Sequence, residues 1–129
     1  AQCLLFGVSQ FTQDAAAFAL RNGGPDVAAM KRTMRERRDV LCDALEAIDG
    51  LVVHRPAGGM FVMVDVTALG CDGESFANGL LDHGGVAVVP GFAFGDSARN
   101  FVRIGFLSDV AVIKKAADKI RDFVSSLSL

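Results

Sequence analysis

The chain has 129 residues, enough for one compact domain that buries roughly two-thirds of the surface of its unfolded chain. Hydrophobic residues make up 51% and charged residues 22% of the sequence, which is typical of a globular protein and excludes a disordered one. The formal net charge of −2 and the absence of Trp and Tyr argue against nucleic-acid binding. No apolar run approaches the roughly 18 to 20 residues of a membrane span, so no membrane partner is expected.

The mean hydropathy of +0.37 is high for so small a domain, so we expect part of its surface to be covered by more protein. Residues 1–6 contain no initiator methionine and no signal-peptide pattern, which favours a chain that begins within a longer protein. Cys3, Cys42 and Cys71 are widely spaced and include no CxxC pair. Free thiols in a cytoplasmic protein are therefore predicted, rather than disulfides or a zinc site.

The hydrophobic pattern predicts two helices in the first fifty residues. The first extends from about Ser9 to Asn22 and ends at the glycines that follow. Pro25 suits the first turn of the second helix, which ends near Gly50. That helix would have about 23 residues and a length of roughly 35 Å, enough to run along one domain and connect it to a neighbour.

The rest of the sequence predicts short strands and helices in the order ββαββα. The four strands are expected at residues 51–54, 60–66, 86–89 and 101–107. The second strand is apolar except at Asp65, so burial on both of its faces is predicted. One helix is expected to start at Asp72 or Ser75 and the last one after a cap at Ser108. The predicted fold class is α+β, a small mixed or antiparallel sheet with helices packed on one face.

The last predicted strand contains the residue with the clearest chemical role. Because side chains alternate across a strand, Val102, Ile104 and Phe106 would face the core while Arg103 and Gly105 point away from it. A guanidinium group there requires an anion, and its planar fork suits a carboxylate bound through two hydrogen bonds. Gly105 would leave room for the ligand. The alternatives are that Arg103 pairs with an acid of its own chain or is exposed on an edge strand.

Five short motifs follow one another along most of the chain. They are F-x-Q-x-A from Phe11, R-R-D-x-L from Arg37, P-x-G-G-x-F from Pro56, G-V-x-V-V-P-G-x-x-F-G from Gly85 and F-V-R-I-G-F from Phe101. In this order and at these intervals, they resemble the C-terminal portion of class I/II aminotransferases, the fold type I enzymes that use pyridoxal phosphate. The loop at 90–95 lacks the features of a phosphate-binding loop and is interpreted as a structural turn.

The resemblance implies a domain division and a set of site residues. Residues 1–24 would be a helical remnant of the large cofactor-binding domain, and residues 25–129 the small domain with its long interdomain helix. Arg103 would bind the α-carboxylate of the amino-acid or 2-oxo-acid substrate. Met60 and Phe61 would lie near the mouth of the substrate pocket, with packing inside the strand as the alternative for both. The whole protein would be a cytoplasmic homodimer that transfers amino groups.

The resemblance also implies that the catalytic lysine is missing. None of the four lysines has the sequence context of the family's Schiff-base lysine, and all fall in predicted helices: Lys31, Lys114, Lys115 and Lys119. The lysine and most cofactor contacts would precede residue 1, so this chain alone is expected neither to bind pyridoxal phosphate productively nor to transaminate. No metal site is expected, because His54 and His83 have no partners at ligand spacing.

Two other functions remain compatible with the sequence. An aminotransferase-like effector-sensing domain of a transcription regulator would keep the same motifs and would be recognised by a helix-turn-helix upstream. A free-standing α+β interaction domain would bind no ligand at all. In that case, replacing Arg103 would leave the affinity for 2-oxo acids unchanged.

Overall fold

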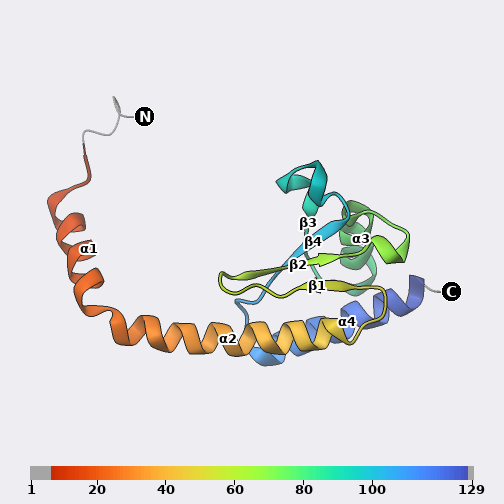
Figure 1. Cartoon of the computed structure of the whole chain (residues 1–129), viewed down its shortest axis with the longest axis horizontal. Helices are drawn as coiled ribbons and strands as arrows, with labels where there is room; N and C mark the ends of the chain where they lie inside the picture. The colour runs from red at the N-terminus through yellow and green to blue at the C-terminus, as the bar shows by residue number, and fades with distance from the viewer. Residues whose placement is uncertain (1–6, 128–129) are drawn as a thin grey trace. The chain divides into compact units, whose positions relative to one another are not determined.

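The computed structural model describes residues 7–127 (Figure 1). They fall into two compact units that divide between Thr33 and Met34. The long helix α2 (Gly24–Glu46) contributes to both units. It begins where the sequence predicts and ends four residues before Gly50, at a turn in which Ile48 and Leu51 donate backbone hydrogen bonds. The thiols of Cys42 and Cys71 are free, as predicted, and Cys3 lies outside the described residues.

The first unit consists of helix α1 (Gln10–Asn22) and the start of α2. Helix α1 ends as its glycine predicts, since the N–H of Gly23 donates to the carbonyl of Ala19 at 2.8 Å. No residue of α1 is buried, and Phe11, Phe18 and Leu20 are largely exposed. This unit therefore carries apolar side chains that its own residues do not cover.

The second unit is built on a four-stranded sheet. Its strands are β1 (Val52–His54), β2 (Phe61–Asp65), β3 (Val89–Pro90) and β4 (Phe101–Gly105), in the order β1-β2-β4-β3. All three neighbouring pairs are antiparallel, which confirms the α+β class and selects the antiparallel form. The expected strand at 86–89 is largely wrong, because residues 86–88 lead from a helical turn to the sheet edge. Pro90 then ends the ladder, since it has no N–H to donate.

The helices of this unit cover one face of the sheet. Helices α3 (Gly73–Gly79) and α4 (Val110–Leu127) lie with the C-terminal half of α2 on one side of the strands (Figure 1). They enclose the inward-facing side chains of β2 and β4, which are fully or almost fully buried: Val62, Val64, Val102 and Ile104. The prediction that β2 is buried on both faces is therefore wrong. Phe61 and Met63 point to the opposite face, which none of the α-helices described in this unit covers.

Two helix starts depend on local polar contacts. Asp72 caps α3 by accepting a hydrogen bond from the N–H of Ser75 at 2.8 Å, and this bond lowers the pKa of its carboxyl. Helix α4 begins at Val110, so the predicted cap at Ser108 is one residue too early. The first turn closes instead on the carbonyl of Asp109.

The R-R-D motif of α2 contacts the chain segments that follow strands β1 and β4. Arg37 donates to the carbonyl of Leu107 at 2.5 Å and to Asp109 at 2.6 Å, in the connection between β4 and α4. Arg38 donates to Asp39 and to the carbonyl of Pro56, which follows β1. Helix α2 is thus fixed to the segments that follow β1 and β4 by two arginines at adjacent positions of the sequence.

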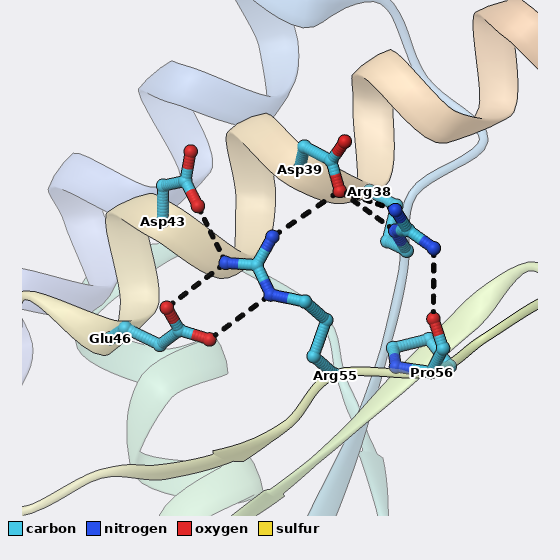
Figure 2. Close-up of polar contacts among 6 residues, drawn as sticks. All are labelled: Arg38, Asp39, Asp43, Glu46, Arg55 and Pro56. Atoms are coloured by element: carbon cyan, nitrogen blue, oxygen red, sulfur yellow. Dashed lines mark hydrogen bonds and ion pairs between the residues drawn. The ribbon is translucent and has the colours of Figure 1, made fainter.

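Arg55 extends this connection into a cluster of acids on α2 (Figure 2). Its guanidinium donates to Asp39 at 3.2 Å, to Asp43 at 2.5 Å and to Glu46 at 2.9 Å. The spacing of the three acids places them along one side of the helix. Hydrogen bonds to Glu46 and then to Asp43 raise the pKa of Arg55, and the hydrogen bond from Arg38 lowers the pKa of Asp39.

We expect Arg55→Met to lower the urea midpoint of the chain at pH 7 and to do so less at pH 3. The pKa of Asp39 is lower in the folded chain than its ordinary value of 3.8, first through the hydrogen bond from Arg38 and to a lesser extent through Arg55. The part of its stabilisation that involves Arg55 is therefore present above that value. It is lost as the pH falls through the lower, folded-state pKa. Circular dichroism during urea unfolding at both pH values measures the difference.

Arg121→Met is the matched control for the Arg55 variant. Among the described residues, the side chain of Arg121 pairs only with Asp118, one turn away on α4, so this pair joins no separate elements. Its replacement should change the urea midpoint little, as is usual for an exposed pair. Equal losses for the two variants, or a loss for Arg55→Met that is the same at both pH values, would contradict the role assigned to the cluster.

Candidate carboxylate-binding site

Arg103 lies in the middle of an interior strand. Strand β4 is paired with β2 on one side and with β3 on the other, and Arg103 stands opposite Met63 and Val89. Its neighbours Val102 and Ile104 are buried on the helix-covered face, so the side chain of Arg103 is on the open face. The predicted alternation is confirmed, and the alternative of an edge strand is excluded.

Two aromatic rings contact the guanidinium group of Arg103. Its Cζ atom lies 4.3 Å from the ring centroid of Phe61 and 4.6 Å from that of Phe94. Phe61 begins β2, whereas Phe94 ends a 3₁₀ turn at Gly91–Phe94 that follows β3. Both distances are within the range of favourable cation–π contacts. The rings restrain the arginine and leave its N–H donors for another partner.

No acidic side chain in residues 7–127 pairs with Arg103, and none of its guanidinium N–H groups donates a hydrogen bond to a described residue. This distinguishes it from Arg37, Arg38 and Arg55, each of which has carboxylate partners. Asp65 is on the same face of the sheet, but it accepts hydrogen bonds from the backbone and hydroxyl of Thr67, which lower its pKa. The alternative of an ion pair within the chain therefore finds no support in the described part.

Gly105 lies beside Arg103 on the same face and opposite Phe61. A Cβ atom on Gly105 would meet the Cδ1 atom of Phe61 and the carbonyl of Met60, each at 3.9 Å. Both are ordinary van der Waals distances, so the ring of Phe61 borders the space beside Gly105 without filling it.

Of the three site residues predicted from the sequence, the structure brings Arg103 and Phe61 into contact. Met60 precedes Phe61, with a side chain that is 45% exposed, and its carbonyl accepts a hydrogen bond from Phe106. Nothing in the described structure links the Met60 side chain to Arg103. Phe94 is the residue that sequence reasoning missed, although the F-x-F-G sequence after Pro90-Gly91 marked its turn.

Close packing at Gly91 explains how the turn carries Phe94 to Arg103. A Cβ atom at Gly91 would lie 2.0 Å from the carbonyl oxygen of Ala98 and 2.6 Å from that of Phe101. Only glycine allows the backbones to approach so closely. The turn predicted at 90–95 is thus confirmed, and its packing places an aromatic side chain at the site.

The lysines of the second unit do not supply a cofactor site beside Arg103. Lys114 and Lys115 are exposed on α4, and Lys119 donates to the carbonyl of Gly84 at 2.7 Å. Helix α4 packs on the face of the sheet opposite to Arg103. Beside Arg103, the residues of this unit fit a carboxylate ligand, and none of its lysines is placed on that face of the sheet for covalent attachment of pyridoxal phosphate.

Neither a metal-binding cluster nor a membrane-spanning helix is found in the part of the chain that the structure describes. Within residues 7–127, no group of three or more His, Cys, Asp or Glu side chains is placed to hold a metal ion. Among the helices of this range, none has both the length and the apolar character needed to cross a membrane.

A helix-covered antiparallel sheet with a free arginine on its open face is the arrangement that the five motifs led us to expect. The chain belongs to the family of class I and II aminotransferases, whose model matches residues 2–120. It is 42% identical over 120 residues to the arginine–pyruvate transaminase of Pseudomonas aeruginosa, covering 93% of this chain and 30% of that protein. It is 34% identical over 116 residues to an aspartate aminotransferase of Musicola paradisiaca, covering 89% of this chain and 29% of the relative.

Solved structures agree with the family assignment. The crystal structure of an aromatic aminotransferase from Pyrococcus horikoshii matches with a TM-score of 0.85 and 27% identity, over 90% of this chain and 31% of that one. The resemblance and the fold class predicted from the sequence are therefore confirmed. The chain spans about 30% of the length of the curated relatives quoted above.

Proposed function

We propose that this chain is the part of a pyridoxal-phosphate-dependent aminotransferase that binds the α-carboxylate of the amino-acid or 2-oxo-acid substrate through Arg103. The observation that carries the proposal is the state of Arg103 itself. Its guanidinium is half-buried on an interior strand, contacted by two rings, and without an acidic partner in residues 7–127. A carboxylate satisfies such a group through two parallel charge-assisted hydrogen bonds.

The role of Arg103 in the reaction is to bind and orient. Because the α-carboxylate is common to all amino acids, the arginine fixes the substrate by a group that does not change between donors. Rigid attachment at that group restricts the position of the neighbouring α-carbon, where amino transfer takes place. Pyridoxal phosphate supplies the electron sink for this chemistry in the complete enzyme.

The rest of the machinery lies, in this proposal, in the remainder of the protein. The lysine and most cofactor contacts would come from the sequence before residue 1, and residues 1–24 would belong to the same large domain. The exposed apolar side chains of α1 support this, since a neighbouring domain would cover them. The complete protein would be a cytoplasmic homodimer.

We expect the 129-residue chain mixed with an equimolar amount of pyridoxal phosphate to show no stoichiometric protein-bound absorption band. The complete protein should show one, and the band should change when an amino acid is added and recover with a 2-oxo acid. Absorption spectra before and after dialysis make the measurement. Random reaction of exposed lysines is recognised because it is substoichiometric and insensitive to amino acids. A stoichiometric band on the isolated chain that responds to an amino acid would overturn the assignment of the lysine to the remainder.

A further inference from the structure

We infer that Phe94 is a positioning residue for the substrate carboxylate, acting through Arg103. The inference rests on the proposed function of Arg103 and adds a second residue to that site. The two rings that contact the guanidinium come from opposite sides of β4, because Phe61 is in β2 and Phe94 follows β3. Together the two rings restrict the guanidinium of Arg103 to orientations in which its N–H groups can donate to a ligand.

A flexible arginine needs such a restraint to bind well. Arg103 has a long side chain and no ion pair or hydrogen bond within the described chain to hold it, so the rings are what orders its charged end. Ordering before the ligand arrives reduces the entropy lost on binding. The contacts with the faces of the rings leave the planar fork free for a carboxylate.

The surroundings of Phe94 argue against a role in core packing. Its side chain is 50% exposed, and it is absent from the buried cluster of the unit. Phe92, two residues earlier in the same turn, is 45% exposed and makes no contact with the Arg103 guanidinium in the described structure. The turn thus carries two phenylalanines of similar exposure, of which one touches the arginine.

This pair provides a matched experiment in the complete enzyme. We expect Phe94→Leu to raise the KM for a 2-oxo acid about 3- to 10-fold while kcat changes less than about 2-fold, because a cation–π contact is lost and the reacting groups are untouched. Phe94→Tyr keeps an aromatic face and should restore the KM. Phe92→Leu removes an equally exposed ring and should leave both constants unchanged.

A double-mutant cycle with Arg103→Lys separates positioning from general damage. In that background the planar fork is already gone, so Phe94→Leu should raise KM by a smaller factor than it does beside arginine. Equal factors in both backgrounds would overturn the inference, as would equal effects of Phe94→Leu and Phe92→Leu. If Phe94→Leu does not fold, Phe94→Met takes its place, and failure of both to fold would show that the residue is structural.

The Arg103→Ala variant tells a failure of the proposed carboxylate site apart from a failure of the role inferred for Phe94. If Arg103→Ala leaves 2-oxo-acid binding unchanged, the carboxylate site itself is wrong and the inference about Phe94 is wrong with it. If Arg103→Ala weakens binding and Phe94→Leu behaves as Phe92→Leu, the site stands and only the role of Phe94 is rejected.

Discussion

Replacing Arg103 by alanine in the complete enzyme is expected to lower kcat/KM by about 100-fold or more for every amino-acid donor. Two hydrogen bonds between charged groups contribute about 1.5 kcal/mol each at the low end, and 3 kcal/mol corresponds to roughly a 100-fold change. Arg103→Lys should recover part of the loss, because the ammonium group keeps the charge but loses the bidentate geometry. Steady-state kinetics with two donors that differ in side chain make the measurement.

The factor should be the same for both donors, since the substrate group that Arg103 is proposed to bind does not vary. Arg121→Ala is the control, because Arg121 is exposed on α4, which packs on the other face of the sheet. A loss confined to one donor would mean that Arg103 contacts a side chain instead. Unchanged affinity for 2-oxo acids would favour a domain that binds no ligand.

Gly91→Ala is expected to destabilise the 129-residue chain by about 2 kcal/mol or more, in the upper part of the range for overpacking. The added Cβ would lie 2.0 Å from a backbone oxygen of Ala98 and 2.6 Å from one of Phe101, and neither is the end of a flexible side chain. Either the turn or the start of β4 must therefore move. Urea unfolding followed by circular dichroism gives the difference in free energy.

Gly58→Ala is the control for the Gly91 variant, because a Cβ there meets nothing within 4 Å and the backbone has no positive φ. Its unfolding free energy should stay within about 0.5 kcal/mol of the parent chain, as for most surface changes. Comparable stability of the two variants would show that the turn at 91–94 adapts easily. The packing described for Gly91 would then not be what places Phe94.

The parts of the fold that follow from regular periodicity could be predicted from the sequence. The alternation along Val102, Arg103 and Ile104 is enough to place the arginine on the face away from the core. A strand turned the other way would bury the charge of Arg103 and expose the two apolar side chains. The glycines and Pro25 marked the helix ends to within a few residues. The motifs then supplied the family, which no single pattern could do.

The open face of β2 shows why other features could not be predicted. Phe61 and Met63 are as apolar as the buried Val62 and Val64, and sequence does not say whether such side chains meet a core, a ligand or another domain. The contact of Phe94 with Arg103 is a different case. It depends on how the turn at 91–94 packs against β4, and this tertiary packing leaves no periodic pattern in the sequence.

In the proposed binding site, the backbone position of Arg103 and the restraint on its guanidinium come from different parts of the fold. The backbone of Arg103 lies in a ladder with β2 and β3, so its position is coupled to the whole sheet. The turn that carries Phe94 is attached at its ends and is open to solvent along much of its length. Substitutions at the exposed positions 92–95, after the closely packed Gly91, can therefore alter how tightly the guanidinium of Arg103 is held while the backbone of Arg103 stays in register.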